Sequence, residues 1–76
     1  MANGVEMAGE WFATEQEFRQ LCGDAQSQAR GESSQEFAAR MVKDAKALGL
    51  RCPLSQKQLK WLCDLADWVM PLRLTK

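Results

Sequence analysis

The stretch that decides the fold lies between Pro53 and Pro71 and reads LSQKQLKWLCDLADWVM, residues 54–70. Placed on a helix at about 100° per residue, its apolar side chains fall into two groups on different sides. One group consists of Leu59, Leu62, Cys63, Ala66, Val69 and Met70, and the other of Trp61, Leu65 and Trp68. A helix with two apolar faces must cover both. The pattern therefore predicts that this helix lies between two others or presents its tryptophan face to a partner.

The ends of this helix are marked by familiar signals. Ser55 followed three residues later by Gln58 has the form of a capping box, and Leu54 is placed to pack against Leu59 across the first turn. Pro71 cannot donate to a helical hydrogen-bond ladder. We therefore expect a helix over about 55–70, followed by a short C-terminal tail.

A second helix is predicted over about 34–48. Ser33 and Glu36 repeat the capping pattern, and Gly49 supplies a residue that can adopt a positive φ at the helix end. Its apolar face is formed by Phe37, Met41, Ala45 and Leu48, with Ala38 and Val42 beside them.

A third helix is predicted over about 14–30, opened by Thr14 and Glu17 and stopped by Gly31. Its narrow apolar stripe consists of Phe18, Leu21, Cys22, Ala25 and Ala29. Gly23 weakens the middle of this helix by up to about 1 kcal/mol relative to alanine.

No segment shows the alternating, β-branched pattern of a strand, and isoleucine is absent from the sequence. The chain is therefore expected to be all-α. We predict a compact three-helix bundle in residues 11–76, preceded by a flexible arm over residues 1–10, with the helix over 55–70 as its most buried member.

Length and charge restrict the function. A chain of 76 residues forms one small domain, and domains of this size are often completed by a partner or a second copy. Ten basic and ten acidic residues cancel, which argues against non-specific binding to nucleic acid. Residues 1–50 carry a net charge of −3 and residues 51–76 a net charge of +3, so a local basic patch remains open.

Several function classes lack support in the sequence. Cys22, Cys52 and Cys63 are widely spaced and histidine is absent, so neither a disulfide framework nor a metal site is indicated. Cys52 beside Arg51 could be a reactive thiolate, although a buried cysteine is the more ordinary expectation. We expect no enzyme activity, catalytic residue or cofactor. With no signal peptide and no stretch of about 20 apolar residues, a cytoplasmic protein without membrane contact is expected.

The strongest candidate for function is a protein-binding surface on the helix over 55–70. Its predicted anchors are Trp61, Leu65 and Trp68, because tryptophan buries much area and is enriched at interface hot spots. The predicted rim charges are Lys57, Lys60 and Arg73. A homodimer would cover the same surface. The competing interpretation is that the first helix, or Trp11 and Phe12, covers these side chains internally.

Two other interpretations remain open. The helices over 34–48 and 55–70 could form a helix-turn-helix DNA-binding regulator, with Gln56, Lys57 and Lys60 near the start of its recognition helix. Alternatively, the acidic side chains Glu10, Glu15, Glu17 and Asp24 could imitate phosphates towards a basic partner.

The segment Leu-Ser-x-Lys-Gln-x-x-Trp-Leu at residues 54–62, preceded by the helix from Phe37 to Leu48, resembles a pattern found in short proteins of bacteriophages and mobile elements. The resemblance covers roughly the last forty residues and implies no fixed activity. It implies a setting in the host cytoplasm, where such a protein binds and inhibits a host protein or complex. Such host targets include defence complexes, for example the CRISPR effectors that anti-CRISPR proteins inhibit.

Overall fold

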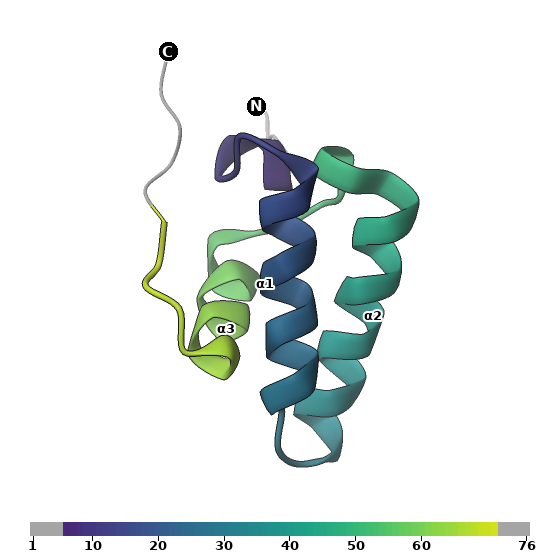
Figure 1. Ribbon diagram of the computed structural model, residues 1–76, viewed down its shortest axis with the longest axis vertical. Helices are drawn as coiled ribbons and strands as arrows, with labels where there is room; N and C mark the ends of the chain where they lie inside the picture. The colour runs from purple at the N-terminus through teal and green to yellow at the C-terminus, as the bar shows by residue number, and fades with distance from the viewer. Residues whose placement is uncertain (1–5, 72–76) are drawn as a thin grey trace.

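The first helix is the one against which the rest of the chain is assembled. The computed structural model describes residues 6–71 and contains, in order, η1 (Ala8–Glu10), α1 (Glu15–Gln28), α2 (Glu32–Leu48), η2 (Gly49–Arg51) and α3 (Gln56–Ala66). α1 packs along both α2 and α3, which lie on either side of it in Figure 1. The predicted all-α, three-helix fold is confirmed. The central helix is α1, so of the two alternatives for the helix over 55–70, a position between two other helices is not observed.

Two of the three predicted helix starts are confirmed. The Thr14 hydroxyl accepts a hydrogen bond from the Glu17 amide at 3.2 Å and caps α1. At α3 the Ser55 hydroxyl accepts from the Gln58 amide at 3.1 Å, and the Gln58 side chain accepts from the Ser55 amide at 3.0 Å. This is the complete capping box that the sequence predicts.

The predicted Ser33 cap of α2 is wrong, because the helix already begins at Glu32. Gly31 is the cap residue, with a φ of 88° and no side chain to contribute a hydrogen bond. Its carbonyl accepts from the Gln35 amide at 3.0 Å. The positive φ turns the chain sharply after α1, so α2 can start before the first serine.

Gly49 ends α2 as predicted. Its φ is 58° and ψ is −132°, a conformation that residues with a Cβ rarely adopt, and its amide donates to the Ala45 carbonyl. A Cβ at this position would lie 2.7 Å from the carboxyl carbon of Glu15 on α1. The backbone conformation therefore favours glycine here, and the flexible Glu15 side chain would have to move aside for any Cβ.

The predicted end of α3 near Met70 is wrong. The helix stops at Ala66, and Asp67 adopts the left-handed conformation with φ 60° and ψ 41°. The amides of Asp67 and Trp68 both donate to the Cys63 carbonyl, the latter at 2.9 Å. This closing turn reverses the chain four residues before the proline that was expected to end the helix.

The predicted flexible arm over 1–10 needs correction from residue 6 onward, residues 1–5 lying outside the described part of the chain. Ala8 is fully buried, and its amide donates to the Cys52 carbonyl at 2.9 Å. The Leu54 amide donates to the Glu6 carbonyl at 2.8 Å, and Glu6 also accepts from the Gln56 amide at the start of α3. The segment is held in place because it covers the end of a core that three short helices leave open.

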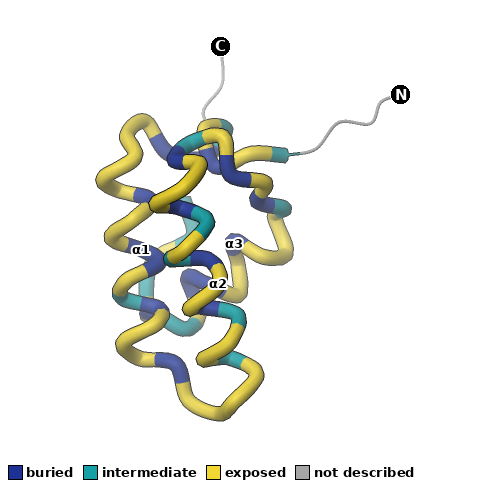
Figure 2. The backbone as a smooth tube through the Cα atoms, turned by 90° about the vertical axis from the view of Figure 1, so that its right-hand side faces the viewer, coloured by how far each residue is buried: buried dark blue, intermediate teal, exposed yellow. Residues whose placement is uncertain are grey.

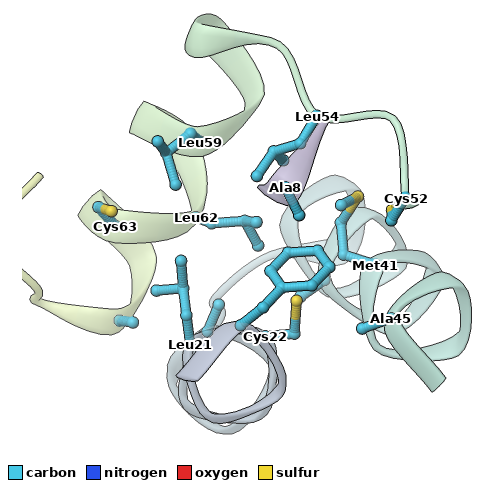
Figure 3. Packing of buried hydrophobic residues seen from close by; sticks show 14 of the residues in the cluster. Ala8, Leu21, Cys22, Met41, Ala45, Cys52, Leu54, Leu59, Leu62 and Cys63 are labelled. Atoms are coloured by element: carbon cyan, nitrogen blue, oxygen red, sulfur yellow. The ribbon is translucent and has the colours of Figure 1, made fainter. Parts of the chain in front are cut away.

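The core is a single apolar cluster in which side chains from all three helices and both short 3-10 turns meet. Leu21 and Cys22 from α1, Met41 from α2 and Leu62 from α3 converge in Figure 3. The other large side chains that are fully buried are Phe18, Leu54, Leu59, Cys52 and Cys63. No polar or charged side chain is buried among residues 6–71.

Burial follows one stripe along each helix, and the outer surfaces are exposed (Figure 2). The predicted inner face of α2 is only partly confirmed. Met41 and Ala45 are buried and Phe37 is half-buried, whereas Leu48, at the last position of the helix, is 42% exposed. Within residues 6–71 no helix has the length and apolar character needed to cross a bilayer.

Candidate protein-binding surface

Trp61 is the predicted anchor that the structure leaves most accessible. It lies on the outer side of α3 and is 41% exposed. Its ring stacks on Phe37 of α2, with the ring centroids 4.1 Å apart and the planes inclined by only 9°. The indole is therefore held flat by an aromatic neighbour on one side, which restricts its rotamers without removing it from solvent.

Leu65 lies one helical turn after Trp61 and continues this surface. It is half-buried and packs against the edge of the core. We define the α3 face as Trp61 and Leu65 of α3 together with Phe37 of α2, whose ring stacks on Trp61. Phe37 was predicted as a core residue of its helix. It lies at the edge of the apolar face of that helix, and this position indicates that its ring could also reach the surface.

Trp68 does not belong to the α3 face, so the predicted row of three anchors on one helix is wrong. It follows the left-handed Asp67, beyond the end of α3, and its indole Nε1 donates to Asp24 Oδ2 on α1 at 2.9 Å. The side chain is half-buried and packs against the core. For Trp68, the competing interpretation of internal coverage by α1 describes the structure better.

The turn that carries Trp68 leaves a shallow groove beside α3. This groove has a volume of about 280 Å³ and is lined by Gln56, Lys60, Cys63, Asp64, Trp68 and Met70. It lies on the side of α3 that carries Lys60 and Asp64, and none of the three residues of the α3 face lines it.

The predicted rim charges differ in their surroundings. Lys57 is exposed and forms no ion pair with a described residue, whereas Lys60 pairs with Asp64 at 3.3 Å. Arg73 lies outside the described residues. Arg40, which sequence reasoning missed, lies one turn after Phe37 on α2 and is also exposed. Arg40 and Lys57 thus flank the stacked rings from the two helices.

The cysteines do not form a reactive centre. All three are buried with free thiols, and they come from three different parts of the fold (Figure 3). Burial, together with the nearby Cys52 and Asp44, raises the pKa of the Cys22 thiol to about 12, and burial also raises the pKa of Cys52 and Cys63. A protonated and inaccessible thiol is a poor nucleophile, so the idea of a reactive Cys52 is not supported.

Most of the acidic residues that were considered as phosphate mimics already have a hydrogen-bond or ion-pair partner within the chain. Glu15 pairs with Arg19 at 2.9 Å, Asp24 accepts from Trp68, and Glu10 accepts from the Met7 amide at 3.0 Å. Glu17 is exposed on the first turn of α1. Since three of the four already hold partners within the chain, they do not present a free row of carboxylates.

The connection between α2 and α3 runs from Gly49 to Ser55 and includes the η2 turn. A helix-turn-helix joins its two helices through three or four residues. Gln56, Lys57 and Lys60 are all exposed on the first turns of α3.

In comparisons with protein-family profiles, with characterised proteins and with solved structures, no match to the chain was found.

Proposed function

We propose that this chain is a small non-enzymatic protein-binding module that acts through the α3 face. The observation that carries the proposal is the exposed, stacked indole of Trp61, which would bury a large apolar area on contact at little cost in side-chain entropy. Leu65 extends the apolar area, and Arg40 and Lys57 provide a polar rim. This combination is typical of the centre and edge of a protein interface.

The partner in this proposal is a host protein or complex, and the setting is that of a phage-encoded inhibitor, as the sequence resemblance implies. A CRISPR effector is one such complex. Self-association through the same face is the other form of the proposal, because two copies related by a twofold axis could place the Trp61 side chains against each other.

The test compares Trp61→Ala with Val69→Ser. Val69 is 90% exposed and lies outside the α3 face, so its replacement removes an exposed apolar side chain without touching the proposed surface. We expect Trp61→Ala to weaken partner binding or self-association by about 2 kcal/mol, or about thirtyfold, and Val69→Ser to leave it unchanged. The readouts are quantitative retention of bacterial lysate proteins and sedimentation equilibrium of the free protein.

Helical content by circular dichroism serves as the control for folding, because loss of the ring stack removes about 0.5–1.5 kcal/mol of internal contact. Trp61→Phe keeps a stacked ring and should retain more binding than Trp61→Ala. Equal retention by the wild type and Trp61→Ala, with a monomer in both cases, would contradict the proposal.

The alternative of a DNA-binding regulator using α3 is less well supported, because the connection between α2 and α3 exceeds that of a helix-turn-helix and Trp61 lies on the proposed recognition helix. Binding to duplex DNA that weakens steeply with added salt and with Lys57→Ala would support this alternative instead.

A further inference from the structure

A second concave site lies between α1 and α2. It has a volume of about 240 Å³ and is lined by Arg19, Cys22, Gly23, Val42, Ala45 and Lys46. Val42 is half-buried and offers accessible apolar surface, whereas Cys22 and Ala45 lie behind it and are almost fully buried. Arg19 and Lys46 are exposed at its edge. We call this site the seam pocket.

Gly23 in the seam pocket is not explained by the fold. It lies in the middle of α1 without a positive φ, and a Cβ added there would meet nothing within 4 Å. Glycine at an exposed helix position costs about 1 kcal/mol relative to alanine. Since neither the backbone nor a neighbour requires glycine, its effect is to leave the α1 backbone open to a group from outside the chain.

The charge of the seam pocket has one sign. No acidic residue lines it, and of its two cations Arg19 pairs with Glu15 whereas Lys46 forms no ion pair with a described residue. An apolar surface with an unpaired ammonium group at its edge is complementary to a group that is both apolar and anionic.

We propose that the seam pocket binds an apolar side chain carried beside a carboxylate on a partner chain. The apolar group would lie against Val42, close to the helix backbone at Gly23. The carboxylate would pair with Lys46. This site is separate from the α3 face, with which it shares no residue, so the two can be tested independently.

The probe is N-acetylphenylalanine, which carries an aromatic ring next to a carboxylate, and its control is N-acetylphenylalanine amide, which has the ring alone. Each is titrated into the ¹⁵N-labelled protein and followed by amide chemical shifts. We expect the acid to shift the signals of Gly23, Val42 and Lys46, with a Kd at least fivefold lower than that of the amide. Equal binding of acid and amide, or shifts centred elsewhere, would overturn the proposal.

Three exposed substitutions complete the test. Gly23→Leu should fold with at least wild-type stability and yet lose binding of the acid at least fivefold, because its own side chain fills the pocket. Lys46→Gln should reduce the preference for acid over amide to less than twofold. Lys43→Gln, an exposed lysine of α2 outside the pocket, should leave it unchanged. Unaltered binding in both Gly23→Leu and Lys46→Gln would also overturn the proposal.

Discussion

Asp67 is the one residue other than glycine that has a positive φ within residues 6–71. At φ 60° and ψ 41° it occupies the left-handed region, which costs about 1–2 kcal/mol for most residues with a Cβ and less for aspartate and asparagine. The position accounts for the early end of α3. Substitutions at Asp67 therefore measure the free energy that this left-handed conformation costs.

We expect Asp67→Gly to be more stable than Asp67→Ala by about 1 kcal/mol, because glycine adopts this conformation without strain and alanine does not. In an ordinary exposed helix position the order would be reversed by a similar amount. The free energy of unfolding of both variants, measured with urea, decides between the two. If Asp67→Ala proved the more stable, α3 would continue beyond Ala66.

At the scale of elements, the end of α3 and the segment after it are attached to α1 by two contacts between residues far apart in sequence. The Trp68 indole donates to Asp24 at 2.9 Å, and the Gln28 side chain donates to the Ala66 carbonyl at 3.2 Å. The first contact is to a charged acceptor and is partly buried, which strengthens a hydrogen bond. We infer that it holds the reversed chain against α1.

A double-mutant cycle with Asp24→Ala and Trp68→Phe measures this contact. We expect Asp24→Ala alone to lower the free energy of unfolding by about 1–2 kcal/mol, and a coupling energy of about 1 kcal/mol between the two sites. Asp24→Asn, which keeps an acceptor oxygen, should lose less. Asp24 also accepts from Gln20 at 2.9 Å, so Gln20→Ala is the matched control. A coupling energy near zero would show that Trp68 is held by packing alone.

The same contacts explain which helix ends could be predicted. The Ser55 capping box is formed by residues three positions apart, so the sequence reveals it directly. α3 ends at the left-handed Asp67, and Trp68 beyond it meets Asp24, 44 residues away, a contact that no local pattern reveals. The start of α2 was likewise not predictable from the local pattern, because the φ of 88° at Gly31 lets the helix begin before the expected serine cap.

The candidate surface was predictable only where it depends on spacing within one helix, and not where it depends on contacts between distant residues. Helical spacing correctly placed Trp61 and Leu65 on a side of α3 away from Leu59, Leu62 and Cys63. The role of Phe37 required the packing of α2 and α3 on the same central helix α1, which brings two rings from distant positions to 4.1 Å. Trp68 was assigned to the wrong surface because its position depended on a helix that ends earlier than the proline suggested.

At the scale of the whole molecule, folding buries all three thiols in an apolar core without a single buried charge among residues 6–71. A thiol in such a place is stable only in its protonated, neutral form. The core therefore links folding to the protonation of cysteine, and the link is strongest at Cys22, where burial, together with the nearby Cys52 and Asp44, raises the pKa to about 12.

This linkage predicts a loss of stability in alkali. In the unfolded chain the Cys22 thiol ionises near its ordinary pKa of 9.0, whereas in the folded protein it stays protonated until about 12. Between these values the unfolded state binds fewer protons, so the free energy of unfolding falls as pH rises, by about 1 kcal/mol at pH 10 for this one group. Urea unfolding of the wild type and Cys22→Ala at pH 7.5 and pH 10 measures the effect, since lysines and the other thiols titrate in both proteins. We expect Cys22→Ala to be less stable than the wild type at pH 7.5 but to lose about 1 kcal/mol less on going to pH 10. An equal loss in both proteins would mean that Cys22 is accessible to solvent in the folded protein.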